Sequence, residues 1–389
     1  MQYIDLSGFD WREHRKFFEE PLKGALAVLS SGVDGSELRA CLTIDGRKIS
    51  NALYGKAARR YFRVFYKASK NHGIALGNVS DLMRLIAEDE AFRQQVGYRS
   101  LKASIPKYRP KQRRLLLDEC LKLLGRLFSY SMFYHGRGWR LDGRNLVSLT
   151  LRNNRVSWDA WTFIRRVQDG CNVLYCPYCN SETIYAVEGV ATTSGRIESS
   201  LDHFFPRNRY PYLGVSLYNL VPACARCNSG GKSSIDSADI TVTPTAVVVT
   251  PALIHPYLES FHSTVRFEYD NLTIRLLSGC GRKEDVQIKA VPISVPRCVA
   301  AKKTISEFGL VELYTSCYWR EFADLPAKMI LQKTCSVLAL KSFLEASPGF
   351  DEKLFNRLLT GVPSGAGSIN AERLLKVKLD LLEQLSAQI

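Results

Sequence analysis

Two Cys-x2-Cys pairs constrain the fold of this chain more than any other feature of its sequence. The first pair is Cys176 and Cys179, and the second is Cys224 and Cys227. Zn²⁺ takes four tetrahedral ligands and binds thiolates well, and each pair supplies two sulfur atoms from one tight turn. Four sulfurs leave no open position for water, so we expect a structural zinc site. The alternative is four cysteines buried in an apolar core without a metal.

The other cysteines and the start of the chain indicate a reducing compartment. The chain has 389 residues and 11 cysteines, and those outside the two pairs follow no ligand spacing. Residues 1–5 show no positively charged segment followed by an apolar one, so no secretory signal peptide is expected. No apolar run is long enough to cross a membrane. We therefore expect a cytoplasmic protein with reduced thiols, in which paired cysteines favour metal binding over disulfides.

The length of the chain predicts more than one module. Hydrophobic residues make up 46% of the sequence, which is enough for packed cores. We expect a basic helical module in residues 1–150, a zinc-stabilised module in residues 151–260, and strands followed by helices in residues 261–389. The Gly-rich basic stretch 135–140 is expected to lie at or just before the first boundary. The predicted class is mainly α with a small α+β centre.

Apolar residues recur at three- and four-residue spacing in several segments of the first half of the chain. This periodicity predicts amphipathic helices at 11–30, 49–71, 80–92, 110–128 and 156–170. Ser80 is expected to cap the third of these helices, and Gly170 is expected to end the last. Two trios of alternating apolar residues predict two strands in 265–277, and helices are expected to return after residue 300.

The net charge of +15 indicates a polyanionic partner, either nucleic acid or an anionic membrane surface. Residues 51–150 hold 20 Lys and Arg against 7 Asp and Glu, so the surplus is concentrated in one part of the chain. The stretch 99–114 supplies four candidates for contacts to nucleic-acid phosphates, Arg109, Lys111, Arg113 and Arg114. Such contacts ignore base sequence and weaken strongly with salt. The alternatives are a solvated basic face and a docking site for a protein.

The segment between the cysteine pairs holds residues suited to phosphodiester hydrolysis. It contains Asp202-His203-Phe204-Phe205-Pro206, then Tyr210-Pro211 and Asn219-Leu220-Val221-Pro222, and Asn228 follows the last cysteine. A neutral imidazole can take a proton from an attacking water, which makes His203 the candidate general base. Asp202 offers a hard oxygen for Mg²⁺ or Mn²⁺. Neighbouring strand residues point to opposite faces, so these two must lie at a strand end or a bulge to share one site.

The order of these motifs resembles the signature of the HNH endonucleases. The resemblance covers residues 171–235 and implies the ββα-metal fold, a β-hairpin followed by a helix around one divalent cation. It further implies that Asp202 and Asn228 bind that cation, Mg²⁺ or Mn²⁺, while His203 activates water. The implied substrate is DNA, most simply double-stranded, cut to leave 5′-phosphate and 3′-hydroxyl ends. Asn219 is expected to hold the loop and to orient His203.

The residues of the motif are similar to those of HNH proteins of bacterial anti-phage systems, such as the Septu-type nuclease subunit, which works beside an ATPase. This likeness implies a role in antiviral defence and an ATPase as a regulatory partner. Arg207 and Lys232 are candidates for phosphate contacts. The HNH family often has a Lys shortly after the second cysteine pair, and here Ser229-Gly230-Gly231 precedes it, which shifts its register.

Each assignment has an alternative. Asp202 and Asn228 can cap local structure instead of binding a cation, and the side chains of Arg207 and Lys232 can be solvated. For the whole chain, the alternatives to a DNA nuclease are an HNH nuclease that acts on RNA and a zinc-stabilised nucleic-acid-binding or scaffold protein without catalysis.

Overall fold

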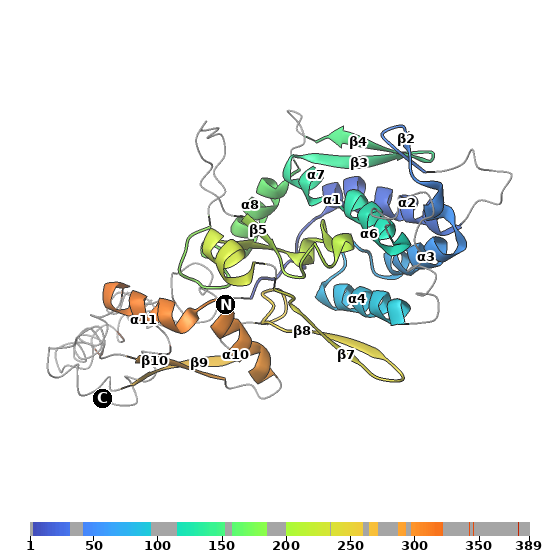
Figure 1. The fold of residues 1–389 in the computed structure, drawn as a ribbon. Helices are drawn as coiled ribbons and strands as arrows, with labels where there is room; N and C mark the ends of the chain where they lie inside the picture. Colours follow the sequence, from blue (N-terminus) through green and yellow to red (C-terminus); the bar gives the residue numbers. More distant parts are fainter. Residues whose placement is uncertain are drawn as a thin grey trace.

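The computed structural model describes residues 3–31, 42–94, 115–151, 158–184, 200–233, 235–259, 264–270, 287–292 and 297–321, together with residues 342, 345 and 380. These residues form helices and four small sheets (Figure 1). The expected class, mainly helical with small sheets, is confirmed. None of the described helices has both the length and the apolar character needed to cross a bilayer.

Helices dominate the first part of the chain. In order they are α1 Arg12–His14, η1 Arg15–Glu19, α2 Glu20–Ser31, η3 Asn51–Tyr54, α3 Lys56–Asn71, α4 Val79–Gln94, α6 Leu116–Leu127 and α7 Tyr130–Tyr134. As its periodicity predicts, α3 buries Tyr61 and Phe65 and leaves most of its Lys and Arg side chains on the opposite face. Asn78 rather than Ser80 caps α4, because Asn78 Oδ1 accepts a hydrogen bond from the Asp81 N–H (3.0 Å).

The stretch 135–140, where we expected a module boundary, is largely a strand. A four-stranded sheet has the order β2 Arg47–Lys48, β1 Thr43–Ile44, β4 Asn145–Thr150, β3 Arg137–Asp142. β3 and β4 are antiparallel, whereas β1 and β4 are parallel. Gly138 permits close packing of β3 on η1, since a Cβ at this position would lie 2.8 Å from Phe17 Cβ. Gly138 therefore serves the packing of β3 on η1.

α8 Ala160–Cys171 leads into the region of the cysteine pairs. Asp159 caps its start by accepting from the Thr162 N–H (2.9 Å). Asn172 ends it in the left-handed conformation (φ 53°). The prediction that Gly170 ends this helix was wrong: Gly170 lies inside it, where a Cβ would collide with the ring of Phe9.

A pair of strands and a helical segment form the centre of the molecule. The elements are β5 Ser200–His203, η5 Pro211–Leu213, η6 Leu217–Asn219, β6 Leu220–Ala223 and the π-helix η7 Arg226–Lys232. β5 and β6 are antiparallel, with Asp202 opposite Val221 and His203 opposite Leu220. Two paired strands followed by a helical segment is the order that the HNH resemblance implies. Its identification as a ββα-metal module stays a prediction.

The loop between β5 and β6 packs into the N-terminal helical region. The Leu217 N–H donates to the Ala75 carbonyl (3.0 Å), and the Ser216 hydroxyl donates to the Ile74 carbonyl (2.7 Å). One continuous cluster of buried apolar side chains runs from α2 and α3 to β5 and β6. Among the described residues, the first two predicted modules therefore share one hydrophobic core. The core is continuous across the boundary predicted at residue 150.

The C-terminal elements lie below the central elements in the view of Figure 1. They are β7 Ala238–Val242, β8 Val247–Pro251, β9 Val265–Asp270, β10 Gln287–Pro292, α10 Cys298–Glu307 and α11 Leu310–Glu321. The first strand predicted in 265–277 is β9, and the second falls outside the described residues. The helices expected after residue 300 are present as far as residue 321. The Ile4 N–H donates to the Pro256 carbonyl (2.7 Å), so the start of the chain lies beside this region.

Candidate metal centre and catalytic site

The four paired cysteines come together in the fold, as predicted. The Sγ atoms of Cys176, Cys179, Cys224 and Cys227 lie within 4.8 Å of one another, and all four residues are buried. The Sγ atoms of Cys179 and Cys224 are 3.9 Å apart. A tetrahedron with Zn–S bonds of about 2.3 Å has edges of roughly 3.8 Å. The cluster therefore has the size and the chemistry to hold one metal ion.

A short hairpin forms the first cysteine turn. Tyr175 and Thr183 bridge its base, and the Cys176 N–H donates to the Glu182 carbonyl (2.8 Å). Inside the turn, the Asn180 N–H donates to the Cys176 carbonyl (2.7 Å). Asn180 has a left-handed backbone (φ 50°), which asparagine adopts more readily than most residues. The turn thus places two thiols on one side of the hairpin by local geometry alone.

The second cysteine turn begins η7 and ties it to β5. The Asn228 N–H donates to the Cys224 carbonyl (2.9 Å), and Asn228 Nδ2 donates to Ser200 Oγ (2.7 Å). The side-chain amide therefore links the helical segment to the strand that carries Asp202 and His203. This link is the role that the structure shows for Asn228. Its predicted role as a ligand of a catalytic cation stays a prediction.

Asp202 is buried, and both of its carboxylate oxygens accept hydrogen bonds. Tyr178 Oη donates to Oδ2 (2.6 Å), and Lys232 Nζ donates to Oδ1 (3.1 Å). Lys232 Nζ also donates to the His203 carbonyl (2.6 Å). The exposed fraction is 2% for Asp202 and 1% for Lys232. A lysine is almost never fully buried without a paired group, and Asp202 supplies the negative charge.

This ion pair corrects two predictions. Lys232 was a candidate for a phosphate contact, but its ammonium group is buried and cannot reach a phosphate in solvent. Asp202 was predicted to bind a divalent cation, but the ammonium group of Lys232 already neutralises its charge. Spacing along the chain did not reveal this outcome, because η7 brings Lys232 back over β5.

His203 lies at the end of β5 and contacts a different set of groups from Asp202. Its Nε2 is 3.0 Å from the Gly214 carbonyl oxygen, and its ring meets that of Tyr130 edge-on, with centroids 4.7 Å apart. A carbonyl oxygen can only accept, so Nε2 carries the proton of the neutral ring. In the part of the chain that the structure describes, Nδ1 has no hydrogen-bond partner. Nδ1 is therefore the basic nitrogen.

The surroundings of His203 keep its ring neutral. Burial is the main cause that lowers its pKa to about 3. The Gly214 carbonyl opposes this shift, whereas the positive charges of Arg207 and Lys232 add to it. At neutral pH the ring therefore carries one proton, on Nε2, and an unprotonated Nδ1. The exposed fraction of His203 is 9%, which makes the ring far less accessible than a surface histidine.

Arg207 flanks the aromatic contact of His203. Its guanidinium group lies over the ring of Tyr130, 5.5 Å from the centroid, and the same ring packs against His203. Arg207 is exposed, so it can meet an anion that arrives from solvent. The location of this residue is compatible with its predicted contact to phosphate.

Asn219 holds the loop that follows β5. Its Oδ1 accepts from the Phe205 N–H (2.7 Å), and its Nδ2 donates to the carbonyls of Phe205 (3.1 Å) and Leu213 (3.2 Å). The predicted role in holding the loop is confirmed. The Leu213 carbonyl lies next to Gly214, whose carbonyl accepts from His203 Nε2. The predicted role of Asn219 in orienting His203 stays a prediction.

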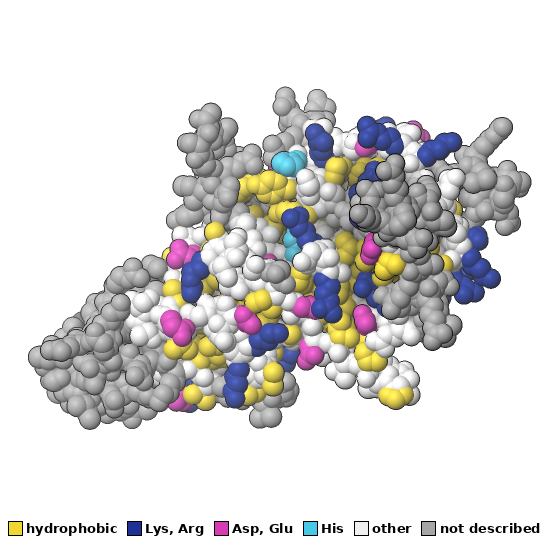
Figure 2. All heavy atoms as spheres, viewed as in Figure 1, with side chains coloured by type: hydrophobic (Ala, Val, Ile, Leu, Met, Phe, Trp, Pro, Cys, Tyr) yellow, Lys and Arg dark blue, Asp and Glu magenta, His cyan; other side chains and the backbone are white. Residues whose placement is uncertain are grey.

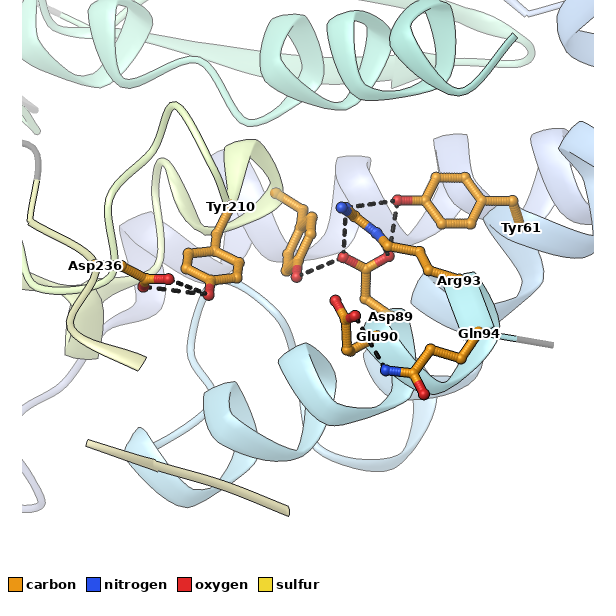
Figure 3. Close-up of polar contacts among 8 residues, drawn as sticks. Tyr61, Asp89, Glu90, Arg93, Gln94, Tyr210 and Asp236 are labelled. Carbon is orange, nitrogen blue, oxygen red and sulfur yellow. Dashed lines mark hydrogen bonds and ion pairs between the residues drawn. The ribbon is translucent and has the colours of Figure 1, made fainter. Parts of the chain in front are cut away.

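Buried polar groups of the N-terminal helices fix the same loop. Tyr212 Oη donates to Asp89 Oδ2 (2.9 Å), and Tyr61 Oη donates to Asp89 Oδ1 (2.8 Å). Arg93 pairs with both carboxylate oxygens, at 3.0 and 2.7 Å. Figure 3 shows α3, α4 and the loop meeting at Asp89. The helical region therefore acts as a scaffold for the loop that orients His203.

His14 supplies a further contact between this scaffold and the loop. Its Nε2 donates to the Val215 carbonyl (2.8 Å), and its Nδ1 accepts from Trp158 Nε1 (3.2 Å). Both nitrogens are thus satisfied only by the neutral ring. Burial lowers the pKa of His14 to about 3, although the Val215 carbonyl opposes the shift.

Acid is expected to destabilise the protein through these histidines. An unfolded histidine binds a proton near its ordinary pKa of 6.5, whereas His14 and His203 bind one only near 3 in the fold. Their contribution to stability is therefore complete above pH 6.5 and is lost as the pH falls toward 3. Each contributes a slope of about 1.4 kcal/mol per pH unit within that window. Urea unfolding at several pH values measures the slope.

Two variants provide the controls for this pH dependence. His14→Gln removes one of the buried histidines, which include His203 and His255, and should reduce the slope. His135→Gln makes the same substitution at an exposed position and is the matched control. A free energy of unfolding that does not vary between about pH 6 and 4 contradicts the burial of neutral histidines.

Three groups that shape the site were not singled out from the sequence. Tyr178 lies inside the first Cys-x2-Cys pair, so its neighbourhood was a usable signal. The Gly214 carbonyl and the Tyr130 ring approach His203 only through the tertiary fold. The four basic candidates Arg109, Lys111, Arg113 and Arg114 fall in 95–114, outside the described residues, and their role stays a prediction.

Comparison of the chain with protein-family models, with curated proteins and with solved structures finds no match. Any function for the chain therefore has to be inferred from its motifs and from the geometry of the site.

Proposed function

We propose that the chain is an HNH-type endonuclease that hydrolyses phosphodiester bonds of DNA. The observation that carries the proposal is His203, a neutral imidazole whose Nε2–H is held by the Gly214 carbonyl and whose Nδ1 is unpaired among the described residues. The order of motifs around this residue supports the same class of enzyme. The similarity of the motif residues to HNH proteins of anti-phage systems favours a role in anti-phage defence beside an ATPase.

The reaction needs a base and positive charge near the phosphate. Nδ1 of His203 takes a proton from water as the water oxygen attacks phosphorus. The bond from phosphorus to the 3′-oxygen breaks, and the leaving 3′-oxygen takes a proton from solvent, which gives 5′-phosphate and 3′-hydroxyl ends. The Gly214 carbonyl then stabilises the imidazolium, because a hydrogen bond from a charged donor is stronger. Arg207 supplies positive charge for the phosphate. An approaching phosphodiester anion raises the pKa of His203 from its low value, which improves it as a base.

The two proposed metals fit this chain differently. Zn²⁺ fits the four-cysteine cluster, where Cys176, Cys179, Cys224 and Cys227 would hold it and stabilise the turn into η7. Mg²⁺ or Mn²⁺ does not fit Asp202 in the observed arrangement, because Tyr178 and Lys232 occupy both carboxylate oxygens. No step of the proposed reaction uses such an ion.

Replacing His203 by alanine tests the proposal. We expect cleavage to fall by a factor of about 10² to 10⁴, because the general base is lost. Cleavage of plasmid DNA and of RNA by the zinc-loaded protein is measured side by side, with Mg²⁺, with Mn²⁺ and without either. His135→Ala, at an exposed histidine, should cleave like the wild type. An active His203→Ala variant, or a folded wild type that cuts neither polymer alone or with its native partners, rejects the proposal.

A second candidate function has its own support. His203 is only 9% exposed, and Asp202 is closed by Lys232, as is expected of structural side chains. These facts favour a zinc-stabilised nucleic-acid-binding protein without catalysis. Binding of nucleic acid without cleavage, equal in wild type and in His203→Ala, is the outcome that this candidate predicts. Preferential cleavage of RNA would instead support a nuclease whose substrate is RNA.

A further inference from the structure

Helix α3 carries a straight line of basic side chains on its exposed face. The line, here called the α3 stripe, consists of Lys56, Arg60, Arg63, Lys67 and Lys70, all of them exposed. The separations of four, three, four and three residues place the five Cα atoms within a sector of about 80° around the helix axis. The stripe is about 21 Å long at the rise of an α-helix.

No carboxylate neutralises the α3 stripe within the described chain. α3 contains no Asp or Glu, and none of the five side chains forms an ion pair with a described residue. Arg63 Nη2 donates only to the Ser30 carbonyl (3.4 Å), and Lys70 Nζ lies over the Tyr66 ring, 5.1 Å from its centroid. Among the described residues, this face of α3 therefore keeps its positive charge.

A groove continues the α3 stripe toward α2. Its volume is about 540 Å³. The polar residues that line it are Ser30, Ser31, Arg63, Tyr66, Lys67 and Lys70. Ala27 and Val28 complete the lining, and no described acidic residue is part of it. Figure 2 shows dark blue side chains at the edge of the molecule where Figure 1 draws α3.

We propose that the α3 stripe and its groove bind the phosphodiester backbone of a nucleic acid. A strand of B-DNA places one negative charge about every 3.4 Å, so a stripe of about 21 Å can follow several consecutive phosphates. Lys, Arg, Ser and Tyr are the side chains that commonly contact phosphate oxygens. Such contacts position the polymer and do not select its sequence.

The apolar face of α3 argues against an anionic membrane as the partner. A helix that lies in a membrane interface buries its apolar face among lipids. In α3 that face is already packed inside the protein, where Tyr61, Phe62 and Phe65 have 0% exposure. Among the described residues, nothing packs on the charged side of α3, which suits a polyanion that binds without insertion.

The proposal adds a binding surface to the proposed nuclease, and its test does not depend on cleavage. Binding is measured with the His203→Ala variant, by fluorescence anisotropy of short labelled duplex and single-stranded DNA. The test protein also carries Arg63→Gln, Lys67→Gln and Lys70→Gln. The matched control carries Arg47→Gln, Lys48→Gln and Lys302→Gln, three exposed basic residues elsewhere. Both have the same net charge, and circular dichroism verifies their fold.

The α3 variant is expected to bind DNA at least about tenfold more weakly than the control at moderate salt. The slope of log affinity against log salt between about 50 and 200 mM should fall by roughly 2 to 3, because three phosphate contacts are lost. Equal losses in the two variants, or binding of the wild type to phosphatidylserine vesicles and not to DNA, overturn the proposal. If the wild type cuts no polymer but these differences in binding appear, the proposed binding surface is supported and the proposed nuclease activity is rejected.

Discussion

Replacement of Cys179 by serine is expected to leave the central region of the protein unfolded. The four Sγ atoms lie within 4.8 Å of one another in a buried cluster, so a metal there joins the first cysteine turn to β6 and η7. A structural zinc contributes about 10 to 16 kcal/mol of apparent binding free energy. A typical domain is stable by only about 5 to 15 kcal/mol. Loss of one thiolate, or removal of the metal by a chelator, is therefore expected to remove most of the stability.

Metal content and thermal unfolding together measure this effect. The wild type should contain one zinc per chain, and its unfolding temperature should drop sharply after dialysis against a chelator. Cys298→Ser is the control, because Cys298 is half-buried and lies outside the cluster. A Cys179→Ser protein that unfolds at the wild-type temperature would show that the cysteines are ordinary core residues. That result would restore the alternative considered from the sequence.

The cysteine cluster was predictable because its geometry is local. Each pair lies in one turn, and the chemistry of thiolates limits what two such turns can do. The amphipathic helices were predictable for a similar reason, since the period of 3.6 residues depends on neighbours along the chain. α3 follows its predicted pattern closely, with Tyr61 and Phe65 inside and Arg60 and Lys67 outside.

The parts that could not be predicted depend on contacts between distant segments. Asp89 in α4 accepts a hydrogen bond from Tyr212 of the loop, and the sequence around either residue does not predict this contact. The Gly-rich stretch 135–140 was expected to lie at a module boundary, but Gly138 permits strand β3 to pack closely on η1. In both cases tertiary packing determined the role of residues whose local pattern suggested something else.

The pairing of Lys232 with Asp202 was missed for a related reason. A lysine soon after a metal-binding turn suggests a contact to phosphate, and a carboxylate beside a histidine suggests a metal ligand. The direction of η7 brings the two together in the interior, where opposite charges stabilise each other far more than in water. The residue types determine which interactions Lys232 and Asp202 can form, and the fold determines which partner each of them meets.

Lys232→Met is expected to destabilise the protein by about 3 to 5 kcal/mol, because it leaves the Asp202 carboxylate buried without a counter-charge. The exposed fractions of the two side chains, 1% and 3%, exclude rescue by solvent. Tyr178 still donates to one carboxylate oxygen, but a neutral donor does not cancel the charge. The free energy of unfolding in urea measures the change.

A double variant and a surface control separate the buried charge from the loss of the lysine stem. Lys232→Met combined with Asp202→Asn removes both charges and keeps an acceptor for Tyr178, so most of the lost stability should return. Lys122→Met removes an exposed lysine that pairs with the half-buried Glu119 (3.5 Å), and it should cost no more than about 1 kcal/mol. If Lys232→Met is as stable as Lys122→Met, the buried pair does not form in solution. Asp202 would then be open to a divalent cation, and added Mg²⁺ should raise the stability of the wild type.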